Sequence, residues 1–330
     1  LDTFGAQVFS DHERYPADVK CLSLLYLYVG RYPRNNASRN TDTLVNLHAY
    51  SPSVVTTGPA TTNPATGVPY GMDFPLVTIR DFVNVQKALL ESLGITSLRA
   101  VMGASMGAMQ AIEWGSAYPE MVERIIPVIG TGEASAFAIA SFNIWSSPIM
   151  LDSNWNGGDY YSSEPPMDGL REALKITILN VRSWEWAEQF GRSWAEEGKD
   201  PAAAFENQYA IEATFDSAAE AFIENADPNH WLYLAKACQN FMAGHGNSLE
   251  EGLAAIEDPV LLIYSPEDLL FFPEQVRATG ELIEADGTPP KVKYAPVPGD
   301  SGHMNGIYYI DQAAERIANF LAWSKGDGGR

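Results

Sequence analysis

The chain has 330 residues, enough for one large domain or for a domain with an inserted subdomain. Its formal net charge of −21 disfavours nucleic acid and anionic membrane surfaces as partners, because both attract Lys and Arg. No apolar run approaches the roughly 20 residues of a membrane-spanning helix. Cys21 and Cys238 cannot form a disulfide framework. We therefore expect a reduced, cytoplasmic protein without a signal peptide.

Strands and helices alternate over much of the chain. The first part predicts strands at 19–29 and 43–50, a helix at 80–93, a strand at 97–104, a helix to about 117 and a strand at 124–130. The last part predicts a strand at 258–265, a helix at 273–285, a strand at 291–298 and a terminal helix at 308–324. This alternation is typical of an α/β protein whose mostly parallel sheet is flanked by helices.

The pattern changes between about residues 135 and 255, where the chain is helical and rich in Ala. This stretch holds six of the eight tryptophans, Trp145, Trp155, Trp184, Trp186, Trp194 and Trp231. We predict that residues 135–255 form a helical cap inserted into a core built from residues 1–134 and 256–330. The tryptophans either pack the cap or a dimer interface, or they wall a substrate pocket.

The connection between Tyr50 and the helix at residue 80 contains no convincing strand. It consists of 29 residues rich in Gly, Pro and Thr, which is long for a loop in a compact domain. Two interpretations stay open. The segment is a long functional loop, or the chain lacks residues near 50–56.

The sequence Gly-Ala-Ser-Met-Gly at 103–107 matches the G-x-S-x-G pattern of a nucleophile elbow. In such an elbow the serine sits on a strained turn between a strand and a helix, and the glycines let backbone segments pass closely. The alternative is a tight turn without chemistry. A predicted strand before Ser105 and a predicted helix after it favour a nucleophilic serine.

A nucleophilic serine needs a general base, and in this fold class the base is a histidine late in the chain. His303 lies in a loop between the last predicted strand and the final helix, where it could reach over the sheet. We therefore predict that His303 is the base. His230 and His245 fall in the predicted cap, and we expect them to be surface or packing residues.

The base in turn needs an acid that orients it. Glu267 and Asp268 both follow the predicted strand at 258–265. We favour Asp268 and keep Glu267 as the alternative. Asp300, only three residues before His303, is expected to be a turn residue.

An oxyanion hole in this fold class uses two backbone N–H groups. The first is expected from Met106, directly after the nucleophile, and the second from Tyr50, after the strand at 43–50. His48 is then expected to be structural. No His, Asp or Cys cluster has the spacing of a metal site, and the glycine-rich segments lack a nucleotide-binding pattern, so we expect no metal and no cofactor.

Several segments resemble the homoserine O-acetyltransferase family of α/β-hydrolases. They include VMGASMGAMQAIEW, YPEMVERII, RDFVNVQKALLESLGI, TGPATTNPATGVPYGMDFP and DLLFFPEQ. The resemblance covers about 43–130 and 258–310, with part of the cap at 226–241. It implies an α/β-hydrolase fold with a helical cap, and a triad of Ser105, Asp268 and His303. It also implies a ping-pong mechanism through an acyl-serine and a homodimer formed through the cap helices.

The chain departs from this family at three positions. Members that use homoserine resemble one another in an Arg and a Tyr seven residues apart on a cap helix, and in an Asp directly after the catalytic His. Leu174, Val181 and Met304 occupy these positions here. If the alignment of this helix is shifted, Arg171 or Arg182 would instead take the place of the family's Arg. Burying a zwitterion among apolar side chains would cost several kcal/mol.

These residues favour a serine ester hydrolase that acts on small-molecule esters with short, acetyl-type acyl groups. The alternative is an O-acyltransferase that moves acetyl from coenzyme A, as a co-substrate, to a hydroxyl acceptor. The two differ in deacylation, because a transferase must keep water from the acyl-enzyme. A third interpretation, a catalytically silent binding protein of the same fold, predicts no labelling by a serine-reactive phosphonate.

Overall fold

The computed structural model describes residues 57–223, 226–246, 248–285 and 291–322, together with the backbone of the strands Ser23–Arg31 and Asp42–His48. Tyr50, Cys21 and the 50–56 segment lie outside the described residues. None of the helices in the described part of the chain has the length and hydropathy needed to span a membrane.

A six-stranded sheet forms the centre of the molecule, in the order β2-β1-β3-β4-β5-β6. Its strands are β1 (Ser23–Arg31), β2 (Asp42–His48), β3 (Ala100–Ser105), β4 (Ile125–Val128), β5 (Val260–Tyr264) and β6 (Val292–Pro296). Strands β3 to β6 are parallel, whereas β1 runs antiparallel to both β2 and β3. The prediction of a mostly parallel sheet flanked by helices is therefore confirmed.

The register of the sheet places the carboxyl ends of β2 and β3 at the same end of the sheet, which we call its carboxyl edge. Leu24 of β1 pairs with His48 on one side and with Ala104 on the other. Because β1 is antiparallel to both neighbours, β2 and β3 run in the same direction. The end of β2 at His48 therefore lies at the same sheet edge as Ser105, one strand away.

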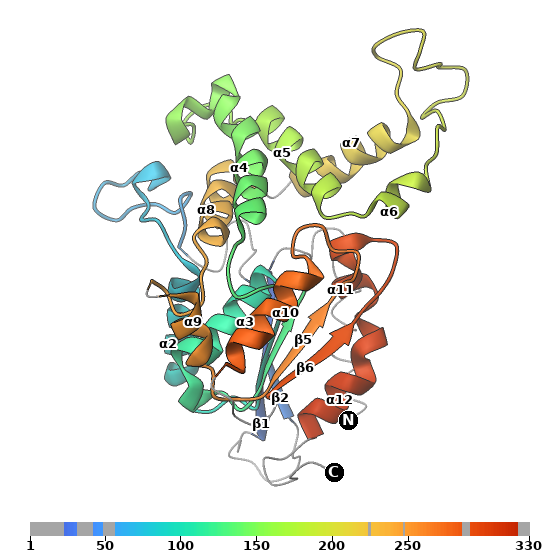
Figure 1. The fold of residues 1–330 in the computed structure, drawn as a ribbon. Coiled ribbons are helices and arrows are strands. Elements are labelled where there is room, and N and C mark those ends of the chain that lie inside the picture. The colour runs from blue at the N-terminus through green and yellow to red at the C-terminus, as the bar shows by residue number, and fades with distance from the viewer. Residues whose placement is uncertain are drawn as a thin grey trace.

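Helices cover both faces of the sheet (Figure 1). On one side lie α2 (Ile79–Ser92), α3 (Met106–Ala117), α9 (Leu249–Ala254) and α10 (Pro273–Ile283). On the other lie α11 (Asn305–Tyr308) and α12 (Ala314–Ala322). Helix α2 begins with a capping box in which Thr78 and Asp81 satisfy each other's backbone N–H groups.

Five helices between β4 and β5 lie beyond the carboxyl ends of the parallel strands (Figure 1). They are α4 (Ala136–Leu151), α5 (Met167–Asn180), α6 (Trp184–Glu188), α7 (Ala210–Ile223) and α8 (Pro228–Gln239). Helix α4 packs against α5 and α8, and α5 packs against α7. The chain therefore carries an inserted helical cap. Helix α9, within the predicted 135–255 range, packs instead against α3 and α10.

Short 3₁₀ helices complete the described elements: Gly71–Asp73, Pro119–Met121, Ser153–Gly158, Gly302–Met304 and Ile310–Ala313. The terminal helix predicted at 308–324 starts later than predicted, which corrects that prediction: residues Ile310–Ala313 form a 3₁₀ turn, and α12 begins at Ala314. Tyr309 has φ −119° and ψ 22°, and it separates α11 from the 3₁₀ turn that leads into α12. The hydroxyl of Tyr309 donates to Asp300, in the loop that follows β6, at 2.7 Å.

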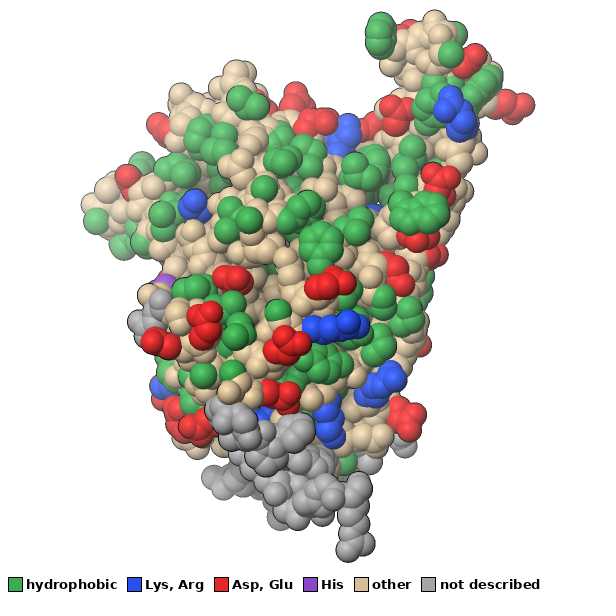
Figure 2. Space-filling view, in the orientation of Figure 1, with side chains coloured by type: hydrophobic (Ala, Val, Ile, Leu, Met, Phe, Trp, Pro, Cys, Tyr) green, Lys and Arg blue, Asp and Glu red, His purple; other side chains and the backbone are tan. Residues whose placement is uncertain are grey.

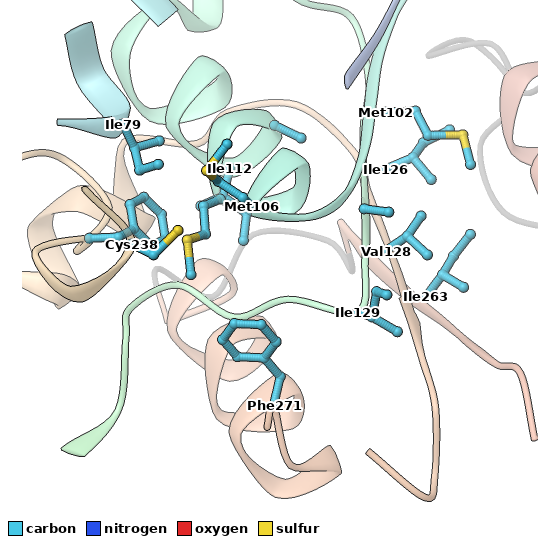
Figure 3. Close-up of a cluster of buried hydrophobic side chains, with 14 of the residues drawn as sticks. Ile79, Met102, Met106, Ile112, Ile126, Val128, Ile129, Cys238, Ile263 and Phe271 are labelled. Carbon is cyan, nitrogen blue, oxygen red and sulfur yellow. The ribbon is translucent and has the colours of Figure 1, made fainter. Parts of the chain in front are cut away.

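The core lies between the sheet and the helices and continues into the cap. Every residue of β3 and β4 is buried. Figure 3 shows part of the buried cluster, which includes Met106 at the start of α3, Cys238 of α8 and Phe271 of the β5–α10 loop. Fully burying a Met or Phe side chain contributes about 1.5–3 kcal/mol. Residues of the cap and of the sheet belong to this one buried cluster.

Candidate active site

Ser105 ends β3 in a strained backbone conformation. Its φ of 55° and ψ of −117° lie in a region that non-glycine residues rarely adopt, and α3 begins at the next residue. Such a conformation costs about 1–3 kcal/mol and persists only where the surroundings impose it. A Cβ at Gly103 would lie 2.2 Å from the carbonyl oxygen of Gly107. Gly103 is therefore required by its close approach to the backbone of Gly107, at the start of the helix.

A chain of hydrogen bonds connects three side chains at the carboxyl edge of the sheet. Oγ of Ser105 lies 2.9 Å from Nε2 of His303, and Nδ1 of His303 lies 2.7 Å from Oδ2 of Asp268. Their exposed fractions are 4 %, 1 % and 1 %. In this arrangement an imidazole can take the serine proton while a carboxylate holds the ring.

The β5–α10 loop fixes the orientation of Asp268. Its Oδ1 accepts the backbone N–H groups of Leu270 at 2.8 Å and Phe271 at 3.0 Å, which leaves Oδ2 for His303. The neighbouring carboxylate of Glu267 is directed elsewhere and accepts from Asn305 at 3.0 Å. Of the two candidate acids, Asp268 is the one in contact with His303.

The cap contacts the loop that carries His303, a contact that no local sequence pattern predicts. Ser183, at the start of α6, donates to the carbonyl oxygen of Asp300 at 2.5 Å, and Gln189 donates to its Oδ2 at 2.8 Å. Gly302 has φ 65°, and a Cβ there would lie 2.6 Å from the backbone nitrogen of Ser183. The corner between α5 and α6 is thus packed directly against the residue that precedes His303.

Asp300 is the polar centre of this contact. The hydroxyl of Tyr309 donates to Oδ1 of Asp300 and is the main cause that lowers the pKa of this carboxyl below its usual value. Ser301 and Gln189 donate as well and act in the same direction. Asp300 thus does more than occupy a turn, because its main chain and side chain both bind the cap.

The three residues predicted to replace polar groups of homoserine-using relatives are all buried. Leu174 is 2 % exposed, Val181 8 % and Met304 2 %. Met304 directly follows His303, and Val181 caps α5 two residues before Ser183. Leu174 lies seven residues earlier on α5, in the helix that packs against α4 and α7. Their role as pocket residues stays a prediction.

A shifted alignment of the cap helix would make Arg171 or Arg182 the substrate-binding arginine, but both already have partners within the protein. Arg171 pairs with Asp168 at 2.6 Å and Glu220 at 3.0 Å. Arg182 donates to the hydroxyl of Tyr308 at 3.0 Å, and its guanidinium lies 5.0 Å from the ring centroid of Trp186. Both guanidinium groups are already engaged within the protein.

The predicted oxyanion donors are only partly described. Met106 is the first residue of α3, so its backbone N–H belongs to the first turn, where N–H groups have no partner within the helix. Tyr50 lies outside the described residues, although β2 ends two residues earlier at the same sheet edge as Ser105. The assignment of both donors stays a prediction.

Two other sequence features lie away from the triad. His230 is on α8, and burial lowers its pKa, which favours the neutral ring of a packing residue. His245 follows α8 in a turn with φ 51°.

Two of the cap tryptophans form hydrogen bonds inside the cap. The indole of Trp145 donates to Asn180 at 2.7 Å, and that of Trp231 donates to the carbonyl of Trp145 at 3.3 Å. These two tryptophans therefore pack the interior of the cap.

Within the described ranges, no group of three or more His, Cys, Asp and Glu side chains is placed to hold a metal ion. The chemistry available at the described edge of the sheet is that of Ser105, His303 and Asp268. Such a set attacks a carbonyl carbon and forms a covalent acyl intermediate.

Comparison with known proteins places this geometry in a family, although no protein-family model matches the chain. Homoserine O-acetyltransferase from Moorella thermoacetica is 38 % identical over 270 residues, which cover 81 % of this chain and 71 % of that protein. The crystal structure of esterase E22 matches with a TM-score of 0.79 and 38 % identity, over 88 % of this chain and 85 % of that one. Homoserine O-acetyltransferase from Bacillus anthracis matches with a TM-score of 0.79 and 30 % identity, over 89 % and 80 %. The chain therefore belongs to the homoserine O-acetyltransferase family of α/β-hydrolases, enzymes that transfer or hydrolyse acyl groups.

Proposed function

We propose that this protein is a serine ester hydrolase that acts on esters of short, acetyl-type acids through an acyl-Ser105 intermediate. The observation that carries the choice of hydrolysis is Met304. This buried apolar side chain directly follows His303. The family resemblance implies an Asp at this position in members that use homoserine. The similarity to esterase E22 supports the same choice.

Acylation would begin at the hydrogen bond between Ser105 and His303. As Oγ of Ser105 attacks the ester carbonyl, Nε2 of His303 takes its proton, over the 2.9 Å that separates the two atoms. Asp268 accepts the Nδ1–H and stabilises the imidazolium that forms. The N–H groups of Met106 and Tyr50 would bind the oxyanion, and His303 then donates its proton to the leaving alcohol.

Deacylation would repeat these steps with water as the nucleophile. Nε2 of His303 takes a proton from water, the hydroxide attacks the acyl carbon, and Oγ of Ser105 leaves with the proton. The acid is released and the free serine is restored. No resident cofactor or metal takes part in this scheme.

The acceptor preference follows from the polarity expected around the acyl group. A homoserine zwitterion needs partners for its carboxylate and ammonium, and a buried charge without partners is strongly disfavoured. Leu174, Val181 and Met304 offer none, and the guanidinium groups of Arg171 and Arg182 are engaged. An uncharged alcohol portion suits such surroundings, and water then resolves the acyl-enzyme.

The alternative is an O-acyltransferase with the same acyl-serine, acetyl-CoA as co-substrate and homoserine or another hydroxyl compound as acceptor. The curated relatives favour it, because the protein from Moorella thermoacetica at 38 % identity is named homoserine O-acetyltransferase. In that case a polar group other than the three replaced positions must bind the acceptor.

We also propose that the chain forms a homodimer through its cap helices. Helix α4 exposes Phe137, Ile144, Met150 and Leu151, with exposed fractions of 51 %, 52 %, 41 % and 83 %. Figure 2 shows hydrophobic side chains over the cap region of the viewed face. A second copy would cover this apolar surface, and sedimentation velocity would detect the dimer.

The proposed reaction is tested by the partition of acetyl groups from p-nitrophenyl acetate. Free acetate and O-acetylhomoserine are quantified while the homoserine concentration is increased, and acetyl-CoA is tried as a second donor. We expect acetate to dominate at every concentration and Ser105→Ala to abolish turnover. Predominant formation of O-acetylhomoserine would favour the transferase.

A further inference from the structure

One amide side chain joins the two loops that carry Asp268 and His303. Asn305 lies two residues after His303 and is fully buried, with 0 % exposure. Its Oδ1 accepts the backbone N–H of Ser301 at 2.8 Å. Ser301 lies in the segment between β6 and α11 that carries His303, which we call the histidine loop. Nδ2 of Asn305 donates to Oγ of Ser265 and to Oε2 of Glu267, each at 3.0 Å, in the β5–α10 loop.

Glu267 extends the same connection from the other loop. Its Oε2 also accepts the backbone N–H of Gly299 at 3.3 Å, near the start of the histidine loop. The hydroxyl of Ser265 donates to this carboxylate at 3.3 Å. Glu267 and Asp268 are adjacent, so one carboxylate binds the histidine loop while the next binds the histidine ring.

The packing around Asn305 leaves little room for movement. A Cβ at Gly299 would lie 2.4 Å from Cε2 of Tyr309 and 2.6 Å from Oδ1 of Asn305, so a larger residue there would have to displace both side chains. Ser265 is also fully buried. Because every polar atom of the Asn305 amide has a partner, loss of one contact would leave buried groups unsatisfied, at about 1–3 kcal/mol each.

We propose that Asn305 and Glu267 are positioning residues that set the distance and angle between Asp268 and His303. The proposal rests on the proposed function for its kinetic readout. Neither side chain contacts Ser105 or the reacting atoms. They act by holding the β5–α10 loop, which carries Asp268, against the histidine loop, which carries His303. This bond orients the imidazole toward Ser105, so a small displacement would reduce the rate of acylation.

The test compares four variants: Asn305→Ala, Glu267→Ala, Glu267→Gln and Arg124→Met. Glu267→Gln keeps an acceptor oxygen for Asn305 and Gly299 without the charge. Arg124 is a matched control, because it is buried to 6 % exposure and donates to the carbonyl of Phe320 at 3.1 Å, at the opposite edge of the sheet. Its hydrogen bonds to Phe320 and Glu123 involve neither loop, so we expect its replacement to lower the melting temperature.

Three readouts are taken well below each variant's melting temperature. They are kcat and KM for p-nitrophenyl acetate, the rate of Ser105 labelling by a fluorophosphonate, and the downfield proton resonance of the hydrogen bond between His303 and Asp268. We expect Asn305→Ala and Glu267→Ala to lower kcat and labelling by about 10- to 100-fold, with KM little changed and the resonance lost. Glu267→Gln should stay within about threefold of the parent protein, because a neutral acceptor still makes the hydrogen bonds.

The proposal is overturned if Asn305→Ala keeps the parent rate and resonance while its melting temperature falls as in Arg124→Met. Equal losses in Glu267→Gln and Glu267→Ala would also overturn it, because the hydrogen bonds alone would then not suffice. If Asn305→Ala does not fold, the two Glu267 variants decide. If the parent hydrolyses no ester, the proposed function fails, but labelling and the resonance still test the positioning role.

Discussion

Oδ2 of Asp268 lies 2.7 Å from Nδ1 of His303, and both side chains are 1 % exposed. A buried contact of this kind fixes the ring so that Nε2 faces Ser105. The backbone N–H groups of Leu270 and Phe271 hold the other carboxylate oxygen, so the acid cannot rotate away from the base.

Asp268→Asn should lower kcat for a small acetyl ester by about 10³- to 10⁴-fold with little loss of fold. The amide can donate to Nδ1, which stabilises the tautomer that cannot accept the serine proton. Steady-state kinetics with circular dichroism measures both effects. Asp311→Asn, an exposed acid on the turn before α12, is the control and should remain as active as the parent. Retention of full activity in Asp268→Asn would remove Asp268 from the mechanism.

Gly103→Ala should disrupt the turn at Ser105. The new methyl group would overlap the carbonyl oxygen of Gly107, at 2.2 Å, so the strand or the helix has to shift. We expect a loss of about 1–3 kcal/mol or more in stability, together with slower fluorophosphonate labelling of Ser105. Gly58→Ala is the matched control, because a Cβ there meets only Nδ1 of His230 at an ordinary 3.5 Å. Equal melting temperatures for the two variants would contradict this account of the elbow.

The contact of the cap with Asp300 should depend on pH. Hydrogen bonds from Tyr309, Ser301 and Gln189 lower the pKa of the Asp300 carboxyl in the folded protein. Its charged form therefore adds stability above the unfolded-state pKa of about 3.9, and this stability is lost as the pH falls through the lower folded-state value.

Asp300→Asn should accordingly lower the melting temperature at neutral pH by about 1–2 °C, because an exposed carboxylate contributes little. The difference between the variant and the parent should shrink below about pH 4. Thermal unfolding followed at several pH values measures it. A difference that grows as the pH falls has the wrong sign for this account.

Met304→Asp tests whether position 304 selects the acyl acceptor. A carboxylate beside His303 could bind the ammonium of homoserine with a charge-assisted hydrogen bond of about 1.5–3 kcal/mol. We expect the fraction of acetyl groups transferred to homoserine to rise about tenfold over the parent. Met304→Asn, a neutral variant of similar shape, should not produce this rise. An unchanged partition in Met304→Asp would show that other residues exclude homoserine.

Local sequence patterns predicted much of this site. The strained turn at Ser105 was predictable from the glycine pattern at 103–107, and the structure shows the close backbone approach at Gly103. His303 could be placed from chain order alone. The choice between Glu267 and Asp268 could not, because adjacent carboxylates differ only in the direction that the loop gives them. Backbone hydrogen bonds to Asp268, absent from any side-chain pattern, decide that direction.

Long-range contacts account for what the sequence did not predict. Asn305 and Ser183 act through hydrogen bonds to loops 40 and 117 residues away, and a lone Asn or Ser carries no signal of such a partner. The late start of the terminal helix has a local setting instead. The sequence predicts a helix from residue 308, whereas the structure has a 3₁₀ turn at Ile310–Ala313 before α12, and the hydroxyl of Tyr309 just before that turn binds Asp300.

The most direct measurement follows acyl-Ser105 itself. The protein is mixed with one equivalent of p-nitrophenyl acetate, quenched at intervals and analysed by intact-protein mass spectrometry, with and without homoserine. We predict an acetyl group on the parent protein, none on Ser105→Ala, and a decay that releases acetate at the same rate in both conditions. A long-lived acetyl-enzyme that decays only when homoserine is added would contradict the ester hydrolase and identify a transferase.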